Sequence, residues 1–123
     1  MQYAAARADL IVVNVNPAFQ PNELEYCINK VGIKTLIMAD KFKKSNYIEF
    51  VQSLIPDLHK SENPLSINPV ENLPTLKNII LMDETKVPGM MNLSDLFQIS
   101  TPVDAIELYK REKNISFDDP TNI

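Results

Sequence analysis

The sequence predicts an α/β fold in which a partial parallel sheet carries helices on its faces. Two short runs, LIVVNV at 10–15 and IKTLIMA at 33–39, are rich in β-branched residues and apolar on both sides, as buried parallel strands are. Segments with apolar residues at helical spacing alternate with such runs along the chain. Strands that alternate with helices are typical of a parallel sheet covered by helices.

The first elements expected are a helix, a strand and a loop. QYAAARA at 2–8 consists of strong helix formers, and strand 10–15 follows it. Pro17 and Pro21 bracket the next loop. Pro21 suits the first position of a second helix, where its missing N–H removes no hydrogen bond.

That second helix is predicted to begin after Gln20 and to end at Gly32. Glu23 lies three residues after Gln20, which favours a capping box, and Gly32 suits a left-handed C-cap. The apolar stripe at i, i+3, i+4 and i+7 consists of Leu24, Cys27, Ile28 and Val31. Strand 33–39 follows, and we expect a right-handed crossover to join it to strand 10–15.

The middle of the chain predicts one further helix and one further strand. The helix spans about 45–55 and is stopped by Pro56. Its stripe consists of Tyr47, Phe50, Val51 and Leu54. The polar segment 59–75 holds three prolines and is expected to be a long, partly disordered surface loop. LKNIILM at 76–82 is the third predicted strand.

The last third is predicted to be helical. VPG at 87–89 indicates a turn, and LSDLFQI at 93–99 a short helix capped by Asn92 or Ser94. A charged helix over VDAIELYKREKN is expected to turn Ile106 and Tyr109 inward, and FDDP then indicates another turn.

Composition excludes several classes of function. The net charge of −4 argues against a nucleic-acid surface, which would be basic. No apolar run is long enough to span a membrane, and MQYAAARADL lacks the pattern of a secretory signal. The single cysteine cannot form an internal disulfide, which fits a reducing compartment.

Glycine is scarce in this chain. Only Gly32 and Gly89 occur, and neither G-x-G-x-x-G nor G-x-x-x-x-G-K is present. Phosphate-binding loops need glycine so that backbone N–H groups can approach the anion. We therefore expect no nucleotide or other cofactor to bind this chain in the usual way.

The histidine and the cysteine are weak candidates for catalysis. His59 follows a helix-ending proline in a polar stretch, so a solvated side chain is favoured over a general base, which would need a positioning partner. Cys27 lies on an apolar stripe without a cationic neighbour, so a buried filler is favoured over a reactive thiolate.

The charged clusters are equally weak candidates. Lys41, Lys43 and Lys44 are interpreted as a solvated basic turn rather than an anion site, because anion binding at a helix start relies on free N–H groups. Asp118 and Asp119 would suggest a metal, but adjacent carboxylates point apart on most backbones and Asp-Pro often opens a turn. No residue is assigned as catalytic, cofactor-binding or metal-ligating.

The run AAARADLIVVNVNPAFQPNELEYCINKVGIKTLIMADKFK nevertheless closely resembles the N-terminal region of the adenylate-forming acyl-CoA synthetases. The matching positions are Asn16, Pro17, Phe19, Glu23, Leu24, Tyr26, Asn29, Gly32, Lys34, Leu36 and Ile37. The wording VNVNPAFQPNELEY is most similar to the mitochondrial medium-chain branch of the family. The closing FDDPTNI is similar to the segment that precedes the family's threonine- and glycine-rich phosphate loop.

The resemblance implies that residues 1–123 are a fragment of the large N-terminal AMP-binding domain, ending just before its phosphate loop. Every family motif that carries chemistry would lie beyond Ile123, so no family catalytic residue can be carried onto this chain. The parent enzyme would be a fatty acid–CoA ligase that uses ATP, magnesium and coenzyme A and lies in the mitochondrion, and this chain would be its scaffold. The alternative is a self-contained, non-catalytic α/β module that binds a partner or regulates a full-length synthetase.

Overall fold

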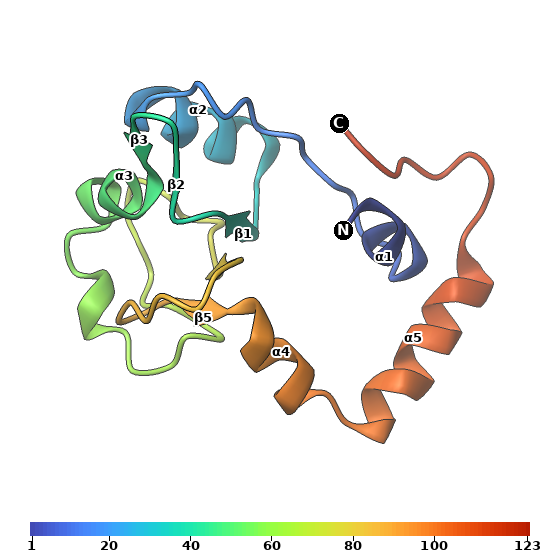
Figure 1. The fold of residues 1–123 in the computed structure, drawn as a ribbon. Helices are drawn as coiled ribbons and strands as arrows, with labels where there is room; N and C mark the ends of the chain where they lie inside the picture. The colour runs from blue at the N-terminus through green and yellow to red at the C-terminus, as the bar shows by residue number, and fades with distance from the viewer. The chain divides into compact units, whose positions relative to one another are not determined.

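The computed structural model describes residues 1–123, which form two compact units (Figure 1). We refer to Val15–Gln98 as the core unit, and to Met1–Asn14 together with Ile99–Ile123 as the terminal unit. Every buried side chain belongs to the core unit. None of the helices is long and apolar enough to cross a membrane.

A three-stranded parallel sheet forms the centre of the core unit. It consists of β1 (Thr35–Met38), β4 (Asn78–Leu81) and β5 (Met91–Asn92), in the order β1-β4-β5. Both faces of β4 are covered, since Ile79, Ile80 and Leu81 are all buried. The predicted α/β class is therefore confirmed, and strands 33–39 and 76–82 are present in shorter form.

The helix predicted from Gln20 to Gly32 is confirmed as α2 (Pro21–Val31). The Gln20 N–H donates to the Glu23 carboxylate at 2.8 Å, and Gly32 adopts the left-handed conformation at φ 74°. Only Leu24 and Ile28 of its stripe are buried, while Cys27 is half-buried and Val31 is exposed.

The helix predicted over 45–55 is α3 (Tyr47–Leu54), and it begins two residues later than expected. Its N-cap is Asn46, whose side-chain oxygen accepts the Glu49 N–H. The residues before it form an unpredicted antiparallel hairpin of β2 (Lys41–Phe42) and β3 (Ser45–Asn46). Helices α2 and α3 contact one another (Figure 1).

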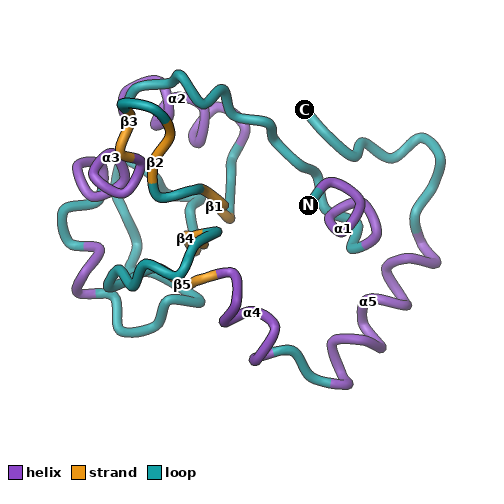
Figure 2. Tube along the Cα trace, viewed as in Figure 1, coloured by secondary structure: helices purple, strands orange, loops and turns teal.

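The segment predicted as a polar surface loop is partly core. It begins within the short 3₁₀ helix η1 (Leu58–Lys60), and its remainder appears in Figure 2 as a long teal stretch leading to β4. Ile67 and Leu73 within it are buried and join the main hydrophobic cluster. Turn hydrogen bonds such as Leu73 N–H to Val70 O at 3.1 Å hold it, so the prediction from its polar composition was wrong for these apolar positions.

Two further elements complete the core unit. The predicted turn at 87–89 is present, with Gly89 at φ 84°, and a Cβ there would lie 2.3 Å from the Leu58 carbonyl oxygen. After β5, helix α4 (Leu93–Ile99) matches its predicted span. Its first turn is closed by the Asp95 carboxylate, which accepts the Asn92 N–H at 2.9 Å, rather than by the side chain of Asn92 or Ser94.

The terminal unit contains α1 (Gln2–Arg7) and α5 (Pro102–Asn114), which contact one another. α5 begins with a capping interaction in which the Thr101 N–H donates to the Asp104 carboxylate at 2.6 Å. The Arg7 guanidinium donates to the Glu112 carboxylate at 3.0 Å and joins the two helices.

The prediction of a buried strand at 10–15 was wrong. Leu10 and Ile11 are exposed, and the segment forms only a short parallel bridge in which Val12 pairs with Asn122. It is not a strand of the β1-β4-β5 sheet, so the predicted crossover through α2 is absent. The β-branched run has strand propensity, but a strand also needs a partner, and here only the last residues of the chain pair with it.

The inward orientation predicted for Ile106 and Tyr109 was also wrong. Both side chains are more than half exposed, and α5 buries no residue. The apolar spacing is typical of a packed helix, but within the terminal unit this helix has only α1 and the chain ends to pack against.

Candidate functional site

The carboxyl edge of the parallel sheet is the first candidate site, because ligands of open α/β sheets bind where parallel strands end. Asp40 follows β1, Asp83 follows β4, and Asp95 lies in the first turn of α4 after β5. Three carboxylates therefore follow three neighbouring strands.

The Asp83 carboxylate stabilises the turn that this residue begins. Its Oδ1 accepts the Thr85 N–H at 2.8 Å. Hydrogen bonds from Thr85 lower the pKa of Asp83 below its usual range, so the group stays ionised.

Asn92 fixes the same turn from the neighbouring strand. The side chain is only 1% exposed, and its Nδ2 donates to the carbonyl oxygens of Asp83 at 2.6 Å and Thr85 at 2.9 Å. The Asn92 N–H lowers the pKa of Asp95, and Lys86 lies 3.3 Å from the same carboxylate. Most polar groups at this edge therefore bond one another, while Asp83 Oδ2 is buried without a hydrogen-bond partner.

The hydrogen bonds of this edge hold its own turns. Its carboxylates accept local hydrogen bonds, and an acidic edge without glycine disfavours a phosphate. No group of three or more His, Cys, Asp or Glu side chains in the chain is arranged to hold a metal ion.

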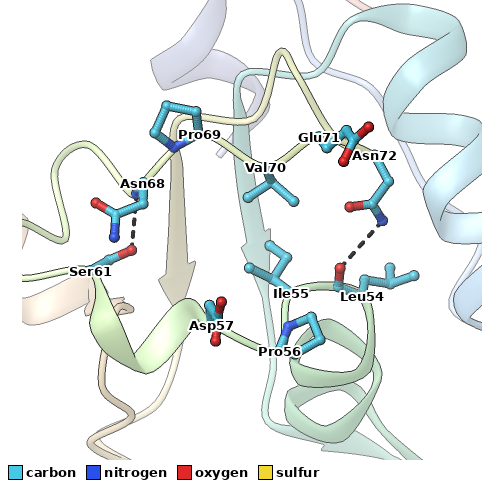
Figure 3. Close-up of a pocket in the computed structure, with 10 residues that line it drawn as sticks. All are labelled: Leu54, Ile55, Pro56, Asp57, Ser61, Asn68, Pro69, Val70, Glu71 and Asn72. Carbon is cyan, nitrogen blue, oxygen red and sulfur yellow. Dashed lines mark hydrogen bonds between the residues drawn. The ribbon is translucent and has the colours of Figure 1, made fainter.

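A hollow of about 330 Å³ is the second candidate, between the end of α3 and the loop that follows η1 (Figure 3). Its lining residues are Leu54, Ile55, Pro56, Asp57, Ser61, Asn68, Pro69, Val70, Glu71 and Asn72. The Asn68 N–H donates to Ser61 Oγ at 2.9 Å, and Asn72 Nδ2 donates to the Leu54 carbonyl at 3.3 Å. These bonds tie the loop to α3 and η1.

The hollow lacks a nucleophile–base pair. His59 lies in η1, but its Nδ1 faces the Pro56 carbonyl at 3.2 Å, while Ser61 Oγ is engaged by Asn68. Asp57 forms an ion pair with Lys60 at 2.8 Å, which lowers the pKa of that carboxyl. The polar groups of the hollow thus stabilise its own walls.

The remaining residues considered from the sequence lie apart. Cys27 is a free, half-buried thiol on α2. Asp119 accepts the Ser116 N–H at 2.6 Å in a turn, and Asp118 is exposed. The basic group of Lys41, Lys43 and Lys44 is exposed on the β2–β3 hairpin.

Sequence reasoning missed the role of Asn92. The pattern Asn-x-x-Asp at Asn92 and Asp95 indicates a helix start in which Asp95 is the acidic capping partner. The pattern does not show that the turn at 83–85 lies next to Asn92. That proximity arises because β4 and β5 pair.

A comparison with protein-family profiles decides the family. Residues 1–121 match the family described as AMP-binding enzyme. The chain belongs to this family. The α/β architecture, with its parallel sheet and flanking helices, is consistent with a part of an AMP-binding domain.

Named relatives of this chain are acyl-CoA enzymes. The chain is 34% identical over its full length to "Medium-chain acyl-CoA ligase ACSF2, mitochondrial" of Danio rerio and to the protein of the same name of Homo sapiens. It is 28% identical to "Putative acyl-CoA synthetase YngI" of Bacillus subtilis. It spans about a fifth of the length of these relatives, 20% of the first two and 22% of the third.

Proposed function

We propose that residues 1–123 act as a structural segment of an AMP-binding domain in a mitochondrial fatty acid–CoA ligase, and that they do not themselves catalyse the reaction. The observation that supports this most is that the chain matches the ligases over its whole length while covering a fifth of theirs. Most polar groups of both candidate sites bond their own turns and loops.

The activity of the whole enzyme would be ATP-dependent formation of an acyl-adenylate, followed by thioester formation with coenzyme A. Fatty acid, ATP with magnesium, and coenzyme A would bind groups supplied by the remaining length of the ligase. The names of the relatives support the acyl-CoA product, the medium-chain substrate and the mitochondrial location.

The terminal unit supports the same proposal. It buries no side chain, yet it exposes large apolar residues on both of its helices and in the segments that follow them. These include Tyr3, Leu10, Ile11, Val103, Ile106, Tyr109 and Phe117. Apolar surface of this extent in a small unit is typical of a surface that another part of a protein covers.

One observation favours the second candidate, a self-contained module. The core unit has its own contiguous hydrophobic cluster and a parallel sheet, which are the features of a segment able to fold alone. A module of this kind would bind a partner or regulate a full-length ligase without catalysis. Its weakness is the terminal unit, whose exposed apolar residues such a module would have to leave uncovered.

A chimaera tests the proposal. Residues 1–123 would replace the matching fifth of the Danio rerio relative, and ATP–pyrophosphate exchange would be measured with medium-chain fatty acids. We expect exchange by the chimaera and none by the 123-residue chain alone. A chimaera carrying Leu81→Asp, which places a charge in the buried β4, is the matched control and should lose activity with the fold. Exchange by the isolated chain would contradict the structural role.

A further inference from the structure

The β2–β3 hairpin concentrates positive charge in an acidic chain. Lys41, Lys43 and Lys44 surround Phe42, and all four side chains are exposed. None of these lysines takes part in an ion pair, since the salt bridges of the chain use Arg7, Lys60, Lys86 and Arg111. The net charge of the chain is −4, so the hairpin differs in sign from the rest of the protein.

The turn of this hairpin places one lysine, Lys43, where glycine or asparagine would fit better. The loop between β2 and β3 consists of Lys43 and Lys44, and Lys43 has a positive φ of 54°. Two-residue hairpin loops with positive φ favour glycine, which has no Cβ, or asparagine, which tolerates the left-handed region. Other side chains are sterically strained there. The chain therefore carries Lys43 at the tip in spite of its conformational cost.

The hairpin does not form a pocket for a single phosphate. The next element is α3, and its first N–H groups are all occupied: those of Tyr47 and Ile48 donate to the Asp40 carbonyl, and that of Glu49 donates to Asn46 Oδ1. An isolated anion would therefore find only ammonium groups on flexible stems. Separate lysines of this kind match an extended anionic surface better than one small ligand.

The exposed ring of Phe42 indicates which kind of anionic surface the hairpin would contact. Its side chain is 48% exposed, and the Lys43 ammonium lies 5.3 Å from the centre of its ring. An apolar ring flanked by lysines fits an anionic bilayer, because the ring can enter the boundary between headgroups and acyl chains while the lysines meet the lipid charges. We propose that the β2–β3 hairpin is a contact site for an anionic lipid surface. The proposal is independent of the ligase assignment.

Sedimentation with lipid vesicles tests this proposal on the full 123-residue chain. The vesicles are phosphatidylcholine with about 30% phosphatidylserine, and phosphatidylcholine alone serves for comparison. We expect the chain to bind the anionic vesicles and to be released by about 1 M salt, which screens the lysines. Each lysine near an anionic surface contributes roughly a fivefold gain in partition, so K41Q/K43Q/K44Q should bind roughly a hundredfold less.

The matched control removes the same charge elsewhere. Lys30, Lys77 and Lys110 are exposed lysines without ion pairs, and K30Q/K77Q/K110Q should bind like the original chain. The single change Lys44→Gln, at a position without positive φ, should lower binding about fivefold and leave the circular dichroism spectrum unchanged. Equal loss in both triple variants, equal binding to neutral vesicles, or tighter binding to a single-stranded oligonucleotide would each overturn the proposal.

Discussion

The core unit and the terminal unit contain helices of similar length and capping, but they bury very different amounts of apolar surface. Helix α2 has eleven residues and buries Leu24 and Ile28, whereas α5 has thirteen residues and buries none. Both helices begin with proline and a capping interaction. Caps and propensity are therefore sufficient to define a helix, but only packing against a sheet and its loops gives it a core.

The two units are therefore stabilised by different kinds of interaction. In the core unit, residues such as Ile79 and Leu81 are fully buried and contribute through removal of apolar surface from water. In the terminal unit the contacts include a cap at Thr101, the Val12–Asn122 bridge and an exposed ion pair between Arg7 and Glu112, and none of them buries a side chain.

The largest expected effect is that of deleting a buried side chain. Leu81→Ala should lower the free energy of unfolding by about 2–5 kcal/mol, because it leaves a cavity in β4. Ile106→Ala on the exposed side of α5 should change it by less than about 0.5 kcal/mol. Urea unfolding followed by circular dichroism measures both. A similar cost for the two variants would remove the distinction between the units.

The second prediction compares the two glycines of the core unit, which both have positive φ. Gly89→Ala should cost about 3 kcal/mol or more, because the new Cβ would meet the Leu58 carbonyl as well as an unfavourable backbone. A Cβ at Gly32 would make only an ordinary contact with Thr75 Cγ2 at 3.9 Å, so Gly32→Ala should cost only about 1–2 kcal/mol. Equal values from urea unfolding would show that the close approach at Leu58 relaxes without cost.

The third prediction concerns the buried amide at the carboxyl edge of the sheet. Asn92→Ala should lower the free energy of unfolding by about 2 kcal/mol, because it leaves the carbonyls of Asp83 and Thr85 without their donor. Asn29→Ala is the matched control, since the Asn29 side chain is exposed and donates a single bond to the Asn72 carbonyl. Its cost should stay below about 1 kcal/mol. A control that costs as much would argue against a special role for burial.

The smallest expected effect is a pH dependence shared by both units. Hydrogen bonds lower the pKa values of Asp95 and Asp104, so each carboxyl binds fewer protons when folded than when unfolded. Their contribution should be complete above the unfolded pKa of about 3.9 and lost as the pH falls through the lowered folded value.

Unfolding midpoints in urea between about pH 6 and pH 3 measure this dependence. Asp95→Asn should reduce the pH dependence of the core unit, and Asp104→Asn should reduce the pH dependence of helicity in the terminal unit. Midpoints that rise as the pH falls would have the wrong sign for this explanation.

Local features of the fold could be predicted from the sequence, and pairing features could not. Pro21, Glu23 and Gly32 define α2 within a dozen residues, and the structure confirms them. The prediction of strand 10–15 was wrong because β-branched residues indicate strand propensity but not which segment will pair with them. The inward prediction for Ile106 failed for the same reason, since helical spacing gives a face but no neighbour.

The candidate sites show the same limit. The lack of a glycine-rich loop is visible in the sequence, whereas the Asn92 clamp requires β4 and β5 to be paired. The hairpin at Lys41–Phe42 and Ser45–Asn46 was missed because its turn uses Lys43 at positive φ instead of glycine or asparagine.

Hydrogen exchange across the full chain tests the contrast between the two units most directly. We expect the amides of β1, β4 and α2 to be strongly protected, because they belong to the buried cluster of the core unit. The amides of α1 and α5 should exchange close to the rate of an unstructured chain. Protection of α5 equal to that of β4 would contradict the account, since it would require a core in the terminal unit.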